Sequence, residues 1–222
     1  MLGRETRVEC RPRTGRLDMR VTKAQAKQNR AHIVATAGRL FRERGYDGVG
    51  VADLMAAAGF THGGFYKHFG SKADLMAEVS ANALSQTAAQ AEGRDATQFV
   101  ERYVTREHRD GRGDGCTIAA LSGDAARQPG DIRKEFEAGI ENLLTALQVA
   151  SQGDTLGDAD GRAARTTMID MLAHSVGAIV LSRACPDDSP LADEILDVCR
   201  KEILASLAHG NSDQPAARSP EA

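Results

Sequence analysis

The sequence predicts an all-α protein, with a small three-helix domain at its N-terminal end and a larger helical bundle behind it. Apolar residues recur at the i, i+3, i+4 and i+7 spacing of amphipathic helices through most of the chain. Residues that cap helices stand before these segments, and glycines or loops follow them. No segment alternates convincingly between apolar and polar residues, so we expect no β-strand.

Residues 21–70 form the first predicted domain. Thr22 opens a capping box at its first helix, and Thr61 is expected to cap its third. Gly45 and Gly59 follow the first two helices and are placed to end them. The three helices are expected at residues 22–44, 51–58 and 61–69.

Residues 71–210 form the second predicted domain, a helical bundle. Ser71 opens a capping box at a long helix that connects the two domains. Residues 211–222 are polar and are expected to be a disordered tail. The helices of the bundle are expected at residues 71–91, 95–108, 116–127 and 131–150, followed by two long ones that carry residues 168–180 and 191–207.

Charge is divided unevenly along the chain, although the net charge is only −3. Residues 1–72 hold 14 Lys and Arg against 6 Asp and Glu, whereas residues 73–222 hold 14 against 25. A basic first domain on an acidic body favours contact between that first domain and a polyanion. Residues 1–20, a predicted disordered basic extension, either contact phosphates as an arm or lie upstream of a true translation start at Met19.

The composition argues against several classes of protein. No apolar run approaches the about 18 residues of a transmembrane helix, and the N-terminal segment has no apolar stretch, so we expect a cytoplasmic protein with no membrane partner. The four cysteines are scattered, and no histidine pair has the spacing of zinc ligands. We therefore predict no metal site, no cofactor and no catalytic residue.

The segment from Val51 to Phe69 has the pattern of a helix-turn-helix unit, because a tight turn at Gly59 joins two short helices. In such units the second helix lies in the major groove of DNA, and its first residues contact base edges. Phe65 and Phe69 are expected to face the core. The opposite face of this helix is predicted to contact DNA through Thr61, His62, Gly63, Tyr66 and Lys67.

Four stretches between residues 24 and 76 stand in one register, namely Gly45-Tyr46, residues 51–61, Phe65–Phe69 and Ser71–Leu75. Together they resemble the N-terminal signature of the TetR/AcrR family of transcriptional regulators. The resemblance implies a homodimer that binds palindromic double-stranded operator DNA, usually as a repressor, and a body whose small-molecule effector releases the DNA. The DNA contacts that it implies are Thr61, His62, Gly63, Gly64, Tyr66, Lys67 and His68, with Lys72 on a phosphate.

The chain departs from the pattern of this family at three positions. Gly50 stands where the family often has Ser or Thr, which puts one contact between a hydroxyl and a phosphate in question. His62 and Gly64 stand where Lys or Arg and Thr or Ser are common. The operator sequence of a relative therefore does not transfer to this chain.

The body is larger than dimerisation alone requires, so we expect it to bind a small apolar or aromatic effector in a mostly apolar cavity. The long helix from Ser71 is the expected switch, because it joins the body to the head. The last two helices are expected to form a four-helix dimer interface that includes Leu196 and Ile203. The residues expected to line the effector cavity are Tyr103, Cys116, Phe136, Met168, Met171 and His174.

Other functions stay open at this point. Cys116 stands at a predicted helix start, where the helix dipole favours a thiolate, so a cysteine-based redox-sensing regulator is one alternative. A helical enzyme and a helical interaction module are the others. An enzyme needs a convergent polar constellation, and an interaction module would lack the polar helix face between residues 61 and 68.

Overall fold

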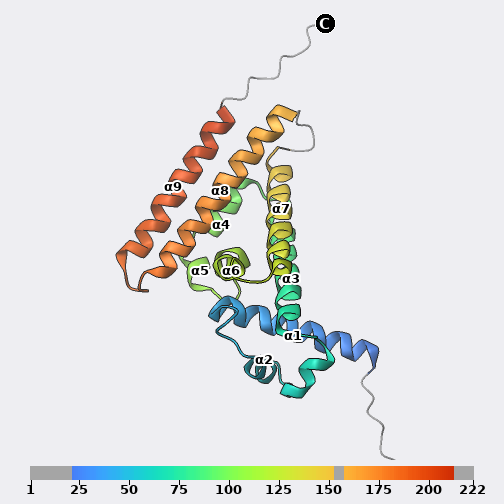
Figure 1. Ribbon diagram of the computed structural model, residues 1–222. Helices are drawn as coiled ribbons and strands as arrows, with labels where there is room; N and C mark the ends of the chain where they lie inside the picture. Colours follow the sequence, from blue (N-terminus) through green and yellow to red (C-terminus); the bar gives the residue numbers. More distant parts are fainter. Residues whose placement is uncertain (1–21, 153–157, 213–222) are drawn as a thin grey trace, which may run out of the picture.

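The computed structural model describes residues 22–152 and 158–212, and within these ranges it forms helices and no β-strand (Figure 1). The predicted all-α class is confirmed. The expectations for residues 1–20 and for residues 213–222 lie outside the described part of the chain. The elements are α1 (Lys23–Arg44), α2 (Val51–Ala57), the 3₁₀-helix η1 (His62–Lys67), α3 (Lys72–Ala91), α4 (Ala96–Tyr103), α5 (Arg106–Asp110), α6 (Thr117–Ala125), α7 (Gly130–Gln152), α8 (Asp158–Ala184) and α9 (Pro190–Ser212).

The head of the molecule consists of α1, α2 and η1, at the bottom of Figure 1. The predicted caps are confirmed, since the Thr22 side chain accepts from the Gln25 N–H at 3.1 Å and Ser71 Oγ accepts from the Asp74 N–H at 3.1 Å. The predicted stop after α1 is also confirmed, because Gly45 takes a φ of 75°, which favours glycine. The core of the head buries Phe41, Tyr46, Leu54, Met55, Phe65 and Phe69.

Two predicted helices differ from the structure. The third helix of the head is a 3₁₀-helix, and Thr61 occupies its N-cap position without a capping hydrogen bond from its side chain. Two adjacent glycines, Gly63 and Gly64, explain the shorter and tighter turn, since each disfavours an α-helix by about 1 kcal/mol relative to Ala. The helix predicted at residues 95–108 is broken after Tyr103, where Thr105 starts α5 by accepting the His108 N–H at 3.1 Å.

The body is built from two long helix pairs (Figure 1). The long helix α3 leaves the head and runs along α7, while α8 and α9 pack against each other on the other side. Gly139 of α7 permits the close approach to α3, because a Cβ there would lie 2.5 Å from the Leu84 Cβ. None of the described helices is both long enough and apolar enough to cross a membrane.

Candidate functional site

The outer surface of the head is formed by the start of η1. Phe65 is fully buried, whereas the neighbouring Tyr66 is 66% exposed. The buried Phe65 therefore fixes the segment against the core while the Tyr66 ring and hydroxyl face solvent. We call the five exposed residues of this segment the head tip, and they are Thr61, His62, Gly63, Tyr66 and Lys67.

The head tip leaves room for a close approach by another molecule. A Cβ placed on Gly63 would meet no atom within 4 Å, so this part of the backbone faces open space. The rings of His62 and Tyr66 lie edge to face with their centroids 6.2 Å apart, and a second edge contact joins Tyr66 to Phe65 at 5.2 Å. These contacts position two hydrogen-bonding side chains beside an unobstructed stretch of backbone.

The remaining predicted DNA contacts lie deeper in the head. Gly64 and His68 are half-buried between the head tip and the core. Lys72 is also half-buried, and its Nζ donates to the Tyr46 carbonyl at 2.6 Å. Through this hydrogen bond Lys72 stabilises the junction between α1 and α3.

Arg30 is a residue of the head that the sequence did not single out. Its guanidinium donates to the His68 carbonyl at the end of η1 and to Glu78 of α3, with 3.0 Å between Nε and Oε1. It also lies over the Phe69 ring, 4.3 Å from the centroid. Arg30 thus ties η1 to both α1 and α3, and planar donors of this kind bind oxygens with defined geometry.

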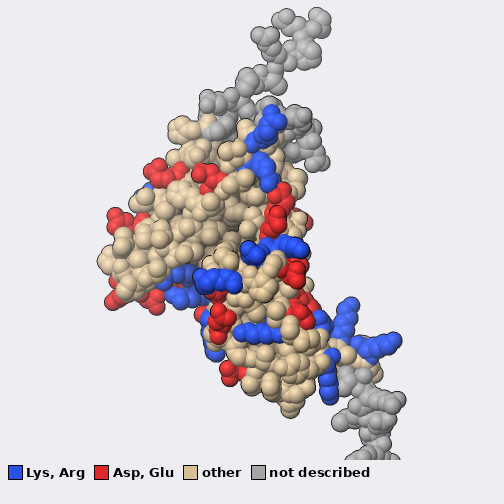
Figure 2. Space-filling view, viewed as in Figure 1, with Lys and Arg blue, Asp and Glu red and all other residues tan. Residues whose placement is uncertain are grey.

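The charge around the head tip is positive. Residues 22–72 carry 8 Lys and Arg against 3 Asp and Glu. Figure 2 shows Lys and Arg side chains projecting from the α1 end of the head, beside an uncharged surface at its lower tip. Basic residues beside a tip that carries Lys67 and otherwise uncharged side chains match the division of DNA binding into phosphate contacts and base contacts.

A second candidate site is a cleft of about 860 Å³ in the body, between α3 and the segment from α4 to the start of α6. Its buried floor includes Phe99, Tyr103, Cys116 and Thr117. Polar and charged side chains form its rim, including Gln86, Gln90, Arg94, Arg102 and Glu107. The volume is that of a small-molecule site, but the lining is largely polar and charged, so the prediction of a mostly apolar cavity is wrong for this cleft.

His108 organises the floor of this cleft. Its Nε2 accepts from the Cys116 N–H at 3.1 Å, so the ring proton lies on Nδ1 and donates to the Tyr103 carbonyl at 2.7 Å. Burial lowers the pKa of His108, which favours this neutral form. These two hydrogen bonds connect His108 of α5 to Tyr103, the last residue of α4, and to Cys116, the residue immediately before α6.

The structure brings together only two of the six residues that were expected to line one effector cavity. Tyr103 and Cys116 both line the cleft, whereas the other four do not. Phe136, Met168 and Met171 are buried in the core, and His174 is half-buried on α8. Helical periodicity marks the buried face of a helix, but it does not separate residues that fill a core from residues that line a cavity.

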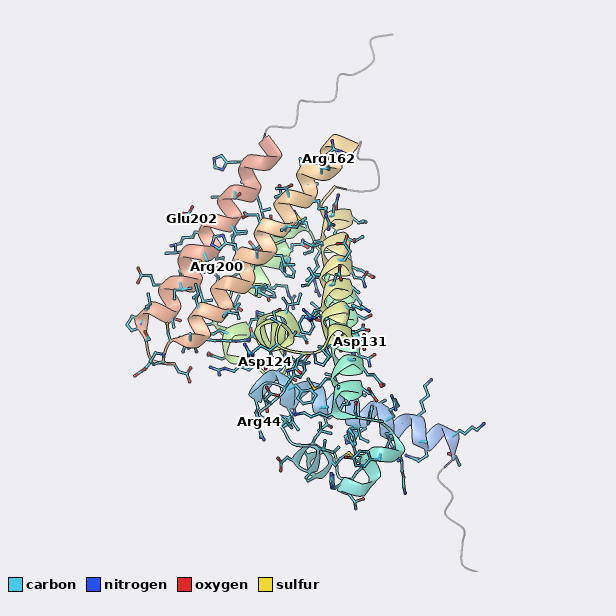
Figure 3. The ribbon with its side chains drawn as sticks, in the orientation of Figure 1. Arg44, Asp124, Asp131, Arg162, Arg200 and Glu202 are labelled. Atoms are coloured by element: carbon cyan, nitrogen blue, oxygen red, sulfur yellow. The ribbon has the colours of Figure 1, made fainter. Side chains whose placement is uncertain are left out.

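The cleft is connected to the head through α6. Arg42 of α1 donates from Nε to the Gly113 carbonyl at 2.7 Å, and Asp124 of α6 accepts the Tyr46 N–H at 3.0 Å. Figure 3 shows Asp124 at this junction, next to the end of α1. Tyr46 also contacts α3, because its hydroxyl lies 2.6 Å from Ser80 Oγ. A displacement of α6 would therefore act directly on the turn that follows α1.

Apolar side chains remain exposed on α8 and α9. Leu191 and Val198 are 52% and 51% exposed and lie seven residues apart, which places them on one face of α9. The other exposed apolar residues of this pair are Ile169, Val180 and Leu181. Leu196 and Ile203, which were expected at a dimer interface, are instead 4% and 3% exposed and fill the chain's own core.

Metal chemistry finds no support in the described ranges. No group of three or more His, Cys, Asp and Glu side chains is arranged there to hold a metal ion. Cys116 is a free thiol at the floor of the cleft, and Cys185 and Cys199 are free thiols outside it.

Comparison with known proteins identifies relatives of the head and of the whole fold. Residues 33–79 match the family model described as bacterial regulatory proteins, tetR family. The regulator AcrR of Shigella flexneri is 40% identical over 60 residues, which cover 27% of this chain and only 28% of that protein. The repressor DhaR of Mycobacterium sp. strain GP1 is 28% identical over 80% of this chain and 93% of its own length.

Solved structures extend the likeness to the body. The crystal structure of a TetR-family regulator from Agrobacterium tumefaciens has a TM-score of 0.63 and 20% sequence identity. The alignment covers 81% of this chain and 98% of that one. At this identity the likeness concerns the fold, a head followed by a helical body.

Proposed function

We propose that this chain, whose residues 33–79 match the model of the tetR family of bacterial regulatory proteins, is a transcriptional regulator that binds palindromic operator DNA as a homodimer and releases it when a small molecule occupies the cleft. The observation that carries the proposal is the head tip, a set of exposed polar and aromatic residues on a buried Phe65 support. A repressor role is supported by the relative DhaR, which is named a transcriptional repressor.

A gel shift with the DNA upstream of the chain's own gene tests this proposal. We expect binding that is stronger than binding to unrelated DNA and that weakens steeply with salt, since basic side chains displace counterions from phosphates. Binding of equal strength to both DNAs would contradict sequence-specific regulation and would favour a general polyanion-binding module.

The paired helices α8 and α9 are the proposed dimer surface. The head of one protomer contacts only a few base pairs of DNA. Pairing two protomers about a two-fold axis doubles the recognised site and places the two half-sites about one helical turn of DNA apart, or a multiple of it. The exposed apolar residues on both helices support this assignment, because large apolar side chains left exposed on packed helices are available to contact a second copy.

The proposed switch has two connections to the head. The first is α3, which continues from the cleft wall into the head. The second is the Asp124 contact with Tyr46, which links α6 to the end of α1. A ligand acts only through its different affinity for two states, so a ligand that shifts α6 would change the orientation of the head.

Replacing Asp124 by alanine tests the second connection. We expect a melting temperature several degrees lower, because the buried Tyr46 N–H loses its acceptor at a cost of about 1–3 kcal/mol. We also expect weaker operator binding, since the head loses one of its supports. Asp131→Ala is the matched control, as Asp131 is 90% exposed at the start of α7. Equal melting temperatures and equal operator affinities for both variants would disprove the role of Asp124.

Redox sensing through Cys116 is the second candidate function. The observation that favours it is the position of the thiol, which lines the cleft at the N-cap of α6 beside the His108 ring. Hydrogen peroxide would oxidise this thiol to a sulfenic acid with water as the other product. The sulfenic acid is larger and more polar than the thiol, so its formation at this position would displace the start of α6.

Under this second candidate, peroxide alone should release the DNA, and Cys116→Ser should abolish the release. Cys185→Ser and Cys199→Ser are the controls, because both residues lie outside the cleft. The measurement is operator binding before and after peroxide, with the mass of the intact protein recorded in parallel. Release that persists in Cys116→Ser would exclude this cysteine as the sensor.

A further inference from the structure

The Tyr103 hydroxyl is a buried polar group that lacks a partner. Among the described residues, two buried side-chain polar atoms make no hydrogen bond, Tyr103 Oη and Ser122 Oγ. Of these two residues only Tyr103 lines the cleft. Buried hydroxyls are nearly always hydrogen-bonded, because an unpaired one has given up its hydration without compensation. Because Tyr103 lies in the floor of the cleft, a ligand atom bound in the cleft can supply the missing partner.

The surroundings of Tyr103 explain why the protein does not satisfy this hydroxyl itself. The ring is held between Phe99, stacked at 4.9 Å, and His108, edge-on at 4.3 Å, so it cannot turn toward solvent. The nearby polar groups are already engaged, since His108 bonds both the Tyr103 carbonyl and the Cys116 N–H. The remaining neighbour is the Cys116 thiol, which interacts with the hydroxyl only as a weak hydrogen-bonding partner.

The hydroxyl keeps its proton and is therefore available as a donor. Burial raises the pKa of Tyr103 well above its ordinary value, and the neighbouring Cys116 raises it further. The protonated hydroxyl can therefore donate to an acceptor atom of a ligand, such as a carbonyl or carboxylate oxygen. The rest of the floor is formed by Phe99, the thiol and small side chains, which suits a flat apolar or aromatic body.

We propose that Tyr103 recognises the effector, by donating a hydrogen bond to a carbonyl or carboxylate oxygen carried on an aromatic or conjugated body. This inference rests on the proposed function in one respect, since it takes the cleft as the effector site. It narrows the effector class from apolar compounds in general to compounds with an acceptor oxygen at the buried end. Polar substituents at the opposite end would face the charged rim.

Three matched compounds test the proposal, namely ethylbenzene, acetophenone and benzoate. They share the ring, and they carry no acceptor, a neutral carbonyl and a carboxylate respectively. We expect the wild-type protein to bind at least one acceptor-bearing compound about tenfold more tightly than ethylbenzene, in titrations followed by NMR. Preference for acetophenone assigns a carbonyl effector, and preference for benzoate assigns a carboxylate. Absence of any preference would overturn the proposal.

Tyr103→Phe is the decisive variant, and Ser122→Ala is its control. We expect Tyr103→Phe to lose the preference for the acceptor oxygen and Ser122→Ala to retain it. The melting temperature of Tyr103→Phe should equal or exceed that of the wild type, because the variant removes an unpaired hydroxyl. A lower melting temperature would show that the hydroxyl has a partner inside the protein, and an unchanged preference would show that it does not select the ligand. Either result would overturn the proposal.

Failure of this inference can be told apart from failure of the proposed function. Ligand-free Tyr103→Phe should bind operator DNA like the wild type, because Tyr103 lies in the body, away from the head tip. Operator binding by the wild type without any compound preference would refute only the role of Tyr103. A compound preference without operator binding would refute only the regulatory function.

Discussion

Alanine replacements of Tyr66 and Lys67 should each reduce operator affinity by roughly 1–3 kcal/mol, and the double variant should lose most specific binding. Both side chains are exposed at the head tip, and neither fills the core, which belongs to Phe65 and Phe69. The fold should therefore persist, as circular dichroism can verify. Fluorescence anisotropy with labelled operator at fixed salt gives the affinities.

The salt dependence separates the roles of the two side chains. Loss of a Lys67 contact with a phosphate should reduce the slope of log affinity against log salt by about 1, whereas loss of a Tyr66 contact with bases should leave the slope unchanged. Lys134→Ala, a charge removed from an exposed position of the body, is the matched control. If the double variant kept full affinity, the head tip would not be the DNA-binding surface.

Glutamate at Leu191 or Val198 should convert the proposed dimer into a monomer. Both side chains are about half exposed in the single chain, so either glutamate can be tolerated in the folded monomer. At an apolar interface the same carboxylate would be buried without a partner, which costs several kcal/mol and lowers the association constant by more than about a hundredfold. Sedimentation velocity at micromolar concentration measures the change.

The control for this prediction is Val149→Glu, on α7. Val149 is 50% exposed, like the two test positions, but it lies outside α8 and α9. We expect this variant to remain a dimer with unchanged operator affinity, whereas the monomeric variants should lose tight binding to a palindrome. A wild-type protein that sediments as a monomer would refute the interface altogether.

Leu196 and Ile203 were expected at the dimer interface but are buried within the chain, so a glutamate at either position would not test dimerisation alone. Both side chains are buried within the chain, so the variants would disturb folding in addition to assembly. The sequence shows that α9 has an apolar stripe, but it does not show which part of the stripe faces α8. Packing within the chain uses the residues at these two positions and leaves Leu191 and Val198 exposed.

The head could be predicted almost completely from its sequence. The capping contacts at Thr22 and Ser71 and the stop at Gly45 involve residues three or four positions apart, so a short stretch of sequence contains both partners. The same holds for Phe65 and Phe69, whose spacing places them on one face of a single turn. The type of the third helix was the exception, because two adjacent glycines there favour a 3₁₀-helix over an α-helix.

The cleft and its connection to the head depend on contacts between distant parts of the chain. Asp124 of α6 bonds Tyr46 across 78 positions, and within the head Arg30 bonds residues 38 and 48 positions away, which is why the sequence did not single Arg30 out. Of the six residues expected around the effector, only Tyr103 and Cys116 meet at one cleft. Sequence by itself determined most of the helices and the exposed face of the head tip, because both follow from short-range periodicity and capping, but it missed the break between α4 and α5. The tertiary structure decided which buried side chains surround a cavity, since that choice is made by how separate helices pack.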